Sequence, residues 1–209
     1  MIVNMALRQI FIELVNTYTS DESIPVSFWN EIEKKYSDHK RYYHTLSHLE
    51  ALFDQLGGCK QLIADRDTLL FSVFYHDIIY NVLKSNNEER SADLAVERLR
   101  ATGVPVDKIN KCKEQILATK SHLLSNNEDT NLLTDADLSV LGQPSDVYEQ
   151  YCGQIRKEYA VYPDLVYKPG RKKVLLYFLH MEKIFKTSFF YDKYELRARE
   201  NLASELKRL

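Results

Sequence analysis

Apolar residues recur at helical spacing along almost the whole chain. The first three segments carry these stripes at Leu7, Ile10, Phe11 and Leu14, at Phe28, Ile32 and Tyr36, and at Leu46, Leu49, Leu52 and Phe53. Such spacing places the apolar side chains on one face of a helix, whereas a half-buried strand would alternate every second residue. Alternation of that kind is hard to find here. The pattern therefore predicts an all-α protein.

Glycine and proline residues are expected to divide the chain into about eight or nine helices, because both interrupt helical patterns. They occur at Pro25, Gly57-Gly58, Gly103 to Pro105, Gly142 to Pro144, Pro163 and Pro169-Gly170. The segment 69–83 is apolar on nearly every side, which predicts a buried central helix. Residues 188–209 carry abundant charge on one face and predict an amphipathic closing helix.

The composition sets limits on the organisation of the chain and on its partners. A chain of 209 residues with 44% hydrophobic content can bury one good-sized core, so we expect a single domain over residues 1–209. Lys and Arg (28) nearly balance Asp and Glu (30), which disfavours nucleic-acid polymers and membrane surfaces as partners. The three cysteines, Cys59, Cys112 and Cys152, form no CxxC pair, and no segment reaches membrane length. The reduced cytoplasm is the natural compartment for such a chain.

Histidines and aspartates stand out within this helical background. His48 occurs in HTLSHLEAL, His76 and Asp77 in FYHDIIYN, and Asp137 in LTDADLSVLG. Imidazole nitrogens and carboxylate oxygens together suit a divalent cation, and four such ligands leave an octahedral ion open positions for water and substrate. A buried ion without compensation costs several kcal/mol, roughly, which coordination to a cation would offset. These residues predict a catalytic metal site between the central helices.

The order of these residues resembles the HD superfamily of metal-dependent phosphohydrolases. That family is defined by a His, an adjacent His-Asp pair and a distant Asp, and the likeness extends here from about Arg41 to Gly142. The runs RYYHTLSHLEAL, FYHDIIYN, NEERSA, ILATKSHL and TDADLSVLG further resemble a bacterial subgroup of predicted HD phosphohydrolases. The resemblance implies a helical bundle of the HD type, with a motif core at about 41–142 and the helices of 144–209 packed on it. It also implies that the metal ligands are His48, His76, Asp77 and Asp137.

Two residues near these expected ligands, His44 and Asp135, can each be interpreted in more than one way. His44 precedes His48 by four residues, so both project from one face if a single helix covers them. The resemblance then places His44 beside the metal, either supporting a ligand or contacting the substrate, while a capping or exposed position is the alternative. Asp135 either caps its helix or orients a ligating histidine. The assignment of Asp137 as the ligand and Asp135 as its support could be reversed.

Two further motifs supply candidate catalytic groups. The resemblance suggests that Glu88 or Glu89 faces the metal cleft as an acid, base or water-orienting group, with Arg90 as a partner for phosphate. Acidic residues are also favourable in the first turn of any helix. Lys120 and His122 are candidate phosphate ligands, and His122 is also a candidate proton donor to a leaving oxygen. Cations at a helix end equally complement the helix dipole.

The expected activity is hydrolysis of a phosphate ester by water that a bound metal activates. The substrate would be a small nucleotide or another phosphorylated metabolite, with Arg41 and Arg171 as weaker candidates for phosphate contact or as solvated surface charges. One divalent metal is expected, with Mn²⁺ or Fe²⁺ favoured and Mg²⁺, Co²⁺, Ni²⁺ or Zn²⁺ compatible. Substrate specificity is expected to reside in the loop near 125–130 and in the C-terminal helices.

Two other classes of function stay open at this stage. Some HD proteins hold two irons and perform oxygenation, but they need additional histidines between the HD pair and the last Asp, and only His122 lies there. The other class is a helical module that binds a nucleotide or a protein without turnover. Tyr42, Tyr43, Tyr75 and Tyr80 flank the motifs, where packing is a commoner role than stacking on a base. The sequence leaves the oligomeric state open, a homodimer included.

Overall fold

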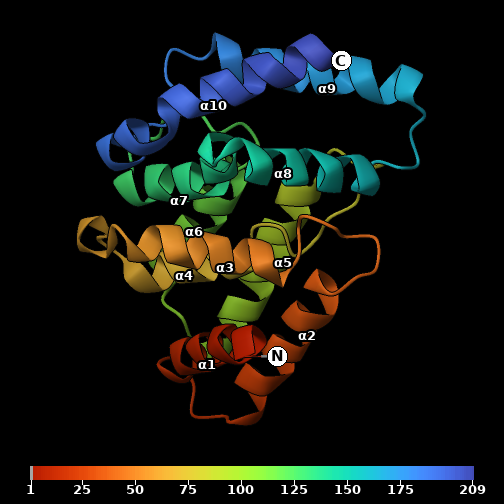
Figure 1. The fold of residues 1–209 in the computed structure, drawn as a ribbon. Coiled ribbons are helices and arrows are strands. Elements are labelled where there is room, and N and C mark those ends of the chain that lie inside the picture. The colour runs from red at the N-terminus through yellow and green to blue at the C-terminus, as the bar shows by residue number, and fades with distance from the viewer. Residues whose placement is uncertain (1) are drawn as a thin grey trace.

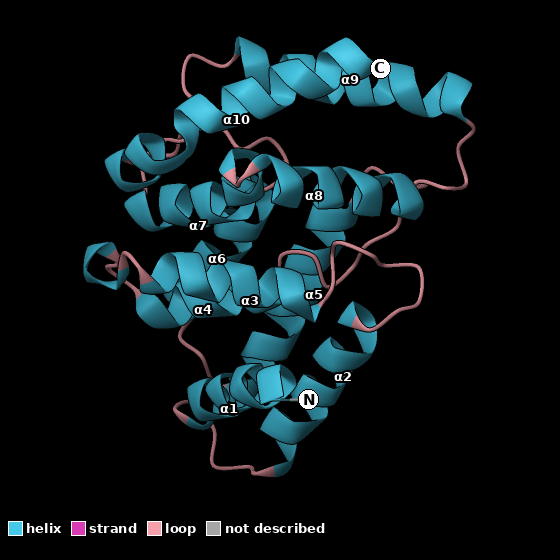
Figure 2. Cartoon of the chain, in the orientation of Figure 1, coloured by secondary structure: helices cyan, strands magenta, loops and turns pink. Residues whose placement is uncertain are grey.

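The protein is entirely helical over the part of the chain that the structure describes. The computed structural model describes the backbone of residues 2–209 and the side chains of residues 5–209. Figure 2 shows helices joined by loops, with no strand among these residues. The expected all-α class is confirmed. None of the described helices has the length and apolar character needed to cross a membrane.

Ten α-helices and two short 3₁₀ helices make up the described chain, slightly more than the glycine and proline positions predict. In chain order they are α1 (Ile2–Asn16), α2 (Ser23–Tyr36), α3 (Leu46–Gly57), η1 (Lys60–Leu62), α4 (Arg66–Tyr75), α5 (Asn87–Thr102), α6 (Val106–Ala118), α7 (Glu128–Leu138), η2 (Ser139–Gly142), α8 (Ser145–Glu158), α9 (Asp164–His180) and α10 (Ser188–Arg208). Figure 1 shows α1 and α2 at one end of the molecule, α9 and α10 at the other, and α3, α4, α7 and α8 between them.

Helix α4 is the centre of the bundle. It packs against α3, α5, α6 and α7, and every side chain from Thr68 to Tyr75 is buried. The Asp65 side chain accepts a hydrogen bond from the backbone N–H of Thr68 and so caps the start of the helix. The prediction of a buried central helix is confirmed for this segment.

The end of α4 differs from the predicted one. The helix stops at Tyr75 rather than near residue 83, so His76 and Asp77 occupy the turn that follows it. The Tyr36 hydroxyl donates to the Phe74 carbonyl and accepts from the Asp77 N–H, at 3.2 and 3.3 Å. Backbone groups freed at the helix end are therefore satisfied by a side chain from α2, and the apolar pattern does not need a helix to continue.

Helix α9 contains Pro169, where the sequence predicts a break. Proline removes the hydrogen bond to the carbonyl four residues earlier, here that of Leu165. Leu165 is 90% exposed, so water can hydrate that carbonyl. The missing bond is thus tolerated near the exposed start of the helix.

One contiguous cluster of buried apolar side chains runs from Leu7 in α1 to Leu202 in α10. Helix α10 packs closely on η2, since a Cβ added at Gly142 would lie 2.5 Å from the Cβ of Tyr194. The Asn201 amide also donates to the carbonyls of Leu141 and Gln143, at 2.8 and 2.9 Å. The C-terminal helix is thereby fixed to the segment that directly follows α7.

Candidate metal centre

Four side chains from three parts of the chain converge at the centre of the molecule. His48 comes from the first turn of α3, His76 and Asp77 from the turn after α4, and Asp137 from the last turn of α7. His48 Nε2 lies 3.2 Å from His76 Nε2 and 3.2 Å from Asp137 Oδ1. Asp77 Oδ2 lies 3.2 Å from His76 Nε2 and 3.8 Å from His48 Nε2. We call these four residues the His-Asp cluster.

The separations within the His-Asp cluster match those between ligands of one ion. Ligand atoms about 2.1 Å from an octahedral cation stand roughly 3.0 Å apart when adjacent and roughly 4.2 Å apart when opposite. The cluster distances, including 3.8 Å between His76 Nε2 and Asp137 Oδ1, fall between these limits or close to the lower one. His48, His76 and Asp137 could therefore hold a metal ion. Asp77 is not in that group, so its role as a fourth ligand stays a prediction.

The surroundings of His76 prepare it for coordination. Its Nδ1 lies 2.9 Å from the Val73 carbonyl, which can only accept, so Nδ1 carries the proton of the neutral ring. The lone pair of Nε2 then points toward the other cluster residues, the usual arrangement of a metal-binding histidine. His48 is also buried, and its Nδ1 has no hydrogen-bond partner in the described structure. Its Nε2, in contrast, lies 3.2 Å from Asp137 Oδ1, so the polar contacts of this buried ring are all on the side of the cluster.

The cluster carries negative charge that protons partly neutralise in the metal-free protein. Burial alone would raise the pKa of Asp77, but the imidazoles of His76 and His44 lower it below its usual value. The pKa of Asp137 is likewise lowered, because hydrogen bonds from His122 and His48 outweigh its burial. Burial would lower the pKa of His76, yet Asp77 and Asp137 raise it to about 9. At neutral pH the metal-free cluster therefore holds a proton on His76.

Metal affinity is expected to rise with pH because this proton must leave before His76 can coordinate. The Kd for Mn²⁺ should fall roughly tenfold per pH unit between about pH 6.5 and 8.5, with one proton released per ion. The stability of the metal-free protein should instead fall as the pH rises. The raised pKa of His76 stabilises the fold fully below the pKa of the unfolded chain, and this stabilisation is lost as pH approaches 9. Calorimetric titration with Mn²⁺ in buffers of different ionisation enthalpy measures the Kd and the number of protons released. A pH-independent Kd without proton release would contradict this expectation.

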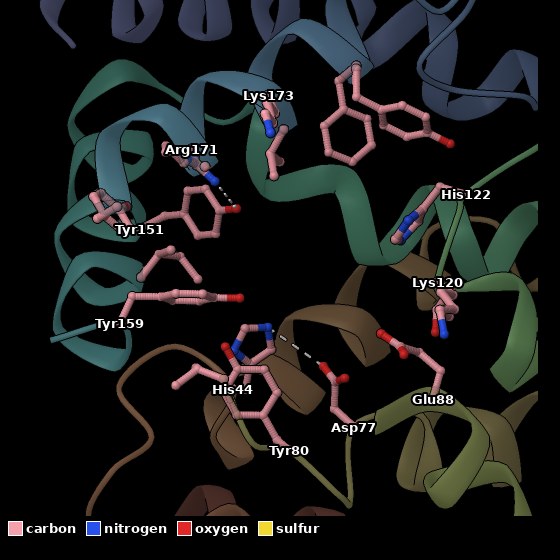
Figure 3. Close-up of a pocket in the computed structure, with 18 of the residues that line it drawn as sticks. His44, Asp77, Tyr80, Glu88, Lys120, His122, Tyr151, Tyr159, Arg171 and Lys173 are labelled. Carbon is pink, nitrogen blue, oxygen red and sulfur yellow. Dashed lines mark hydrogen bonds and ion pairs between the residues drawn. The ribbon is translucent and has the colours of Figure 1, made fainter. Parts of the chain in front are cut away.

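A cavity of about 800 Å³ opens beside the His-Asp cluster, and we call it the main cavity. Asp77, Asp137, His44 and His122 line it, and Figure 3 shows several of these side chains facing the opening. His122 follows α6 in a left-handed conformation, with φ of +53°. Its Nε2 lies 2.8 Å from Asp137 Oδ2. One oxygen of Asp137 thus faces His48 and His76 while the other holds His122 at the cavity wall.

His44 reaches the same wall from outside α3, because that helix begins at Leu46. Its Nε2 lies 3.8 Å from Asp77 Oδ2. Its Nδ1 lies 2.7 Å from Glu158 Oε2, and its ring lies 4.2 Å from that of Tyr80 between centroids. His44 is thus held next to the cluster by a carboxylate and an aromatic ring.

Glu158, at the end of α8, is a site residue that the sequence does not single out. Its Oε1 accepts three backbone hydrogen bonds, from Tyr42, Tyr43 and His44, and its Oε2 accepts from His44 Nδ1 and the Tyr80 hydroxyl. Burial would raise its pKa, but these donors lower it to about 2. Glu158 lies among charged residues at a helix end, where a glutamate is ordinary, so the local pattern gives no signal.

Only some of the predicted catalytic and phosphate-binding residues line the main cavity. Glu88 and Lys120 line the main cavity, while Glu89 does not. The Lys120 ammonium pairs with the Glu89 carboxylate and donates to the Ser85 carbonyl at 2.8 Å. Arg90 is exposed and outside the wall, so its expected position facing the cleft is wrong. Arg90 lies in the first turn of α5, and Glu88 of the same turn lines the cavity.

Two other predicted residues have structural partners instead. Arg41 is buried and donates to the backbone carbonyls of Asp77 and Ile78, at 2.7 and 2.9 Å, rather than facing the cavity for phosphate. It supports the turn that carries the HD pair. The Asp135 carboxylate accepts hydrogen bonds from the backbone of Lys186 and Thr187, at 2.8 to 3.0 Å, so the expected support of a ligating histidine is corrected.

Much of the rest of the cavity wall comes from α8 and α9, and it is rich in tyrosine. Tyr80 is joined there by Tyr151, Tyr159, Tyr162, Tyr167 and Tyr177. Residues of α8 and α9 line the wall and those of the loop at 125–130 do not, so the expected part of the C-terminal helices in substrate specificity stays a prediction. Tyr75 is buried in the core, whereas Tyr42 and Tyr43 border a smaller cavity of about 320 Å³.

Comparison of the chain with protein-family models, with curated proteins and with solved structures gives no match. Membership of the HD superfamily therefore stays a prediction from the motifs. The function has to be argued from the site itself.

Proposed function

We propose that the protein is a metal-dependent phosphohydrolase that cleaves a phosphate ester of a small nucleotide or another phosphorylated metabolite. The observation that carries this proposal is the convergence of His48, His76, Asp77 and Asp137. Both aspartates line a cavity large enough for such a molecule, and the two histidines lie buried behind them. A divalent cation at this position supplies a Lewis acid for a phosphoryl oxygen and lowers the pKa of a water molecule. Mn²⁺ or Fe²⁺ is the metal that we favour.

The residues around the cluster fit the other requirements of phosphate hydrolysis. Lys120 brings positive charge to the wall, partly balanced by Glu89, and His122 brings a second nitrogen base held by Asp137. Charge of this kind stabilises phosphoryl groups during transfer. Glu88 forms no ion pair or hydrogen bond through its side chain to other described residues, which leaves it able to orient water or accept its proton.

The test combines metal analysis with a screen for phosphate release. The purified protein should bind close to one equivalent of metal after loading with Mn²⁺ and should release phosphate from some members of a panel of nucleotides and sugar phosphates. Chelation should stop the release, and returning Mn²⁺ should restore it. Two irons per chain with oxygen consumption would instead indicate an oxygenase. A ligand that binds and leaves unchanged would indicate a binding module.

A further inference from the structure

The main cavity extends from the His-Asp cluster to a second wall built by α8 and α9. Arg171 and Lys173, both on α9, line this wall together with Tyr151 of α8. Figure 3 shows these three side chains across the opening from Asp77 and Glu88. Positive charge therefore occurs at the end of the cavity that lies away from the cluster.

Arg171 is held in a fixed orientation at this wall. Its Nε and Nη2 donate to the two carboxylate oxygens of Glu205, at 2.8 and 2.9 Å, and its side chain is only 6% exposed. The remaining nitrogen, Nη1, lies 3.5 Å from the hydroxyl of Tyr151. Such a bidentate pair fixes the plane of the guanidinium, so that one N–H of Nη1 is directed at Tyr151 and the other is left for another acceptor. Burial raises the pKa of Tyr151, so its hydroxyl keeps the proton needed to donate.

One of the two positive charges of this wall, that of Lys173, has no acidic partner among the described residues. Glu205 neutralises Arg171, but Lys173 forms no hydrogen bond or ion pair with the described residues. The carboxylates that line the main cavity, those of Asp77, Glu88 and Asp137, all belong to the cluster end. Between the two ends the wall is mostly aromatic, with Tyr80 and Tyr159 facing the opening in Figure 3. The cavity thus has two polar ends separated by flat apolar surfaces.

We propose that Arg171, Lys173 and Tyr151 form a subsite for a second anionic group of the substrate. The substrate would then be a small molecule with a phosphate at the cluster end, a ring or short chain against the tyrosines, and a phosphate or carboxylate at the α9 wall. The inference rests on the proposed function in one respect only, which is that the phosphate at the cluster end is the group that is hydrolysed. Lys173 is exposed, so its charge is hydrated until an anion binds at this wall.

Binding without turnover tests the subsite directly. In the presence of a chelator, calorimetry compares adenosine 5′-monophosphate with adenosine 3′,5′-bisphosphate, and glucitol 6-phosphate with gluconate 6-phosphate. The member with two anionic groups should bind at least about tenfold more tightly in one or both pairs, equivalent to about 1.4 kcal/mol. A difference in the adenosine pair alone assigns the subsite to phosphate. A difference in both pairs shows that a carboxylate is accepted as well.

A matched pair of variants separates the subsite from general surface charge. Lys173→Ala should remove most of the preference for two anionic groups. Lys172→Ala removes the same charge from the next position of α9, which is exposed and outside the cavity wall, and should preserve the preference. Equal affinities within both ligand pairs, or equal losses in the two variants, would overturn the proposal.

Phosphate release with Mn²⁺, measured separately, distinguishes this inference from the proposed function. If the two-anion ligands bind as expected but no phosphate is released from any of them, the subsite stands and the phosphohydrolase proposal fails. If phosphate is released from one-anion and two-anion substrates with equal kcat/KM in both the wild type and Lys173→Ala, the subsite is wrong and the phosphohydrolase proposal stands.

Discussion

The Asp77→Asn variant is expected to lose its bound metal and on the order of a thousandfold in phosphate release. Asparagine keeps the size of the side chain but replaces the charged oxygen that lies 3.2 Å from His76 Nε2 with a neutral group. The cluster then has one carboxylate instead of two for a divalent cation. Loss of the charge stabilisation that a metal provides, about 4 kcal/mol, corresponds to this fall in rate. Elemental analysis and initial rates with the best substrate of the panel measure the two effects.

The control for this variant removes a carboxylate of the same kind elsewhere. Asp93 of α5 is 69% exposed and pairs with Lys113 at the surface, so Asp93→Asn should keep full metal content and activity. Thermal melting shows whether Asp77→Asn stays folded. A folded Asp77→Asn protein with wild-type metal content and rate would show that Asp77 is not a ligand and that His48, His76 and Asp137 suffice to hold the ion.

The periodicity of the sequence was sufficient to predict the helices but not where each one ends. Leu7, Phe11 and Ile32 are buried as their spacing predicts, because a stripe on one face is a property of the segment itself. The end of α4, in contrast, is not set by the local apolar pattern. It depends on Tyr36 and Arg41, which lie far from it in sequence and take up its free backbone groups.

The candidate site shows the same division between local and distant information. The four cluster residues could be named from their motifs, but their separations depend on how α3, α4 and α7 pack. Arg41 and Asp135 lie beside those motifs and bind backbone groups instead of ligands. The sequence does not distinguish an arginine or aspartate that binds a ligand from one that binds backbone groups. Only the fold separates these two roles. Glu158 could not be found because its partners are 78 to 116 residues away.

Glu158→Gln is expected to destabilise the fold by about 3 kcal/mol, because it leaves buried donors unpaired. The amide can accept through its oxygen, but its NH₂ group cannot accept from both His44 Nδ1 and the Tyr80 hydroxyl, as Oε2 does. For a chain of this length the melting temperature should fall by about 6 to 12 °C. His44 should also lose its orientation beside Asp77, which would lower kcat for phosphate release in the protein that remains folded. Thermal melting and initial rates below the melting range measure both effects.

The pH dependence of this loss distinguishes the carboxylate from a general packing role. The pKa of Glu158 is lowered to about 2, so its contribution to stability is present above the unfolded value of about 4.5 and is lost as pH falls toward 2. The difference in melting temperature between the wild type and Glu158→Gln should therefore be largest near neutral pH and should shrink below about pH 4.5. Glu149→Gln is the matched control, because Glu149 is an exposed residue of the same helix that pairs with Arg208 and should change stability by less than about 1 kcal/mol. A difference that stays constant from neutral to acidic pH would mean that Glu158 acts through its volume and not through the hydrogen bonds that hold His44 beside the His-Asp cluster.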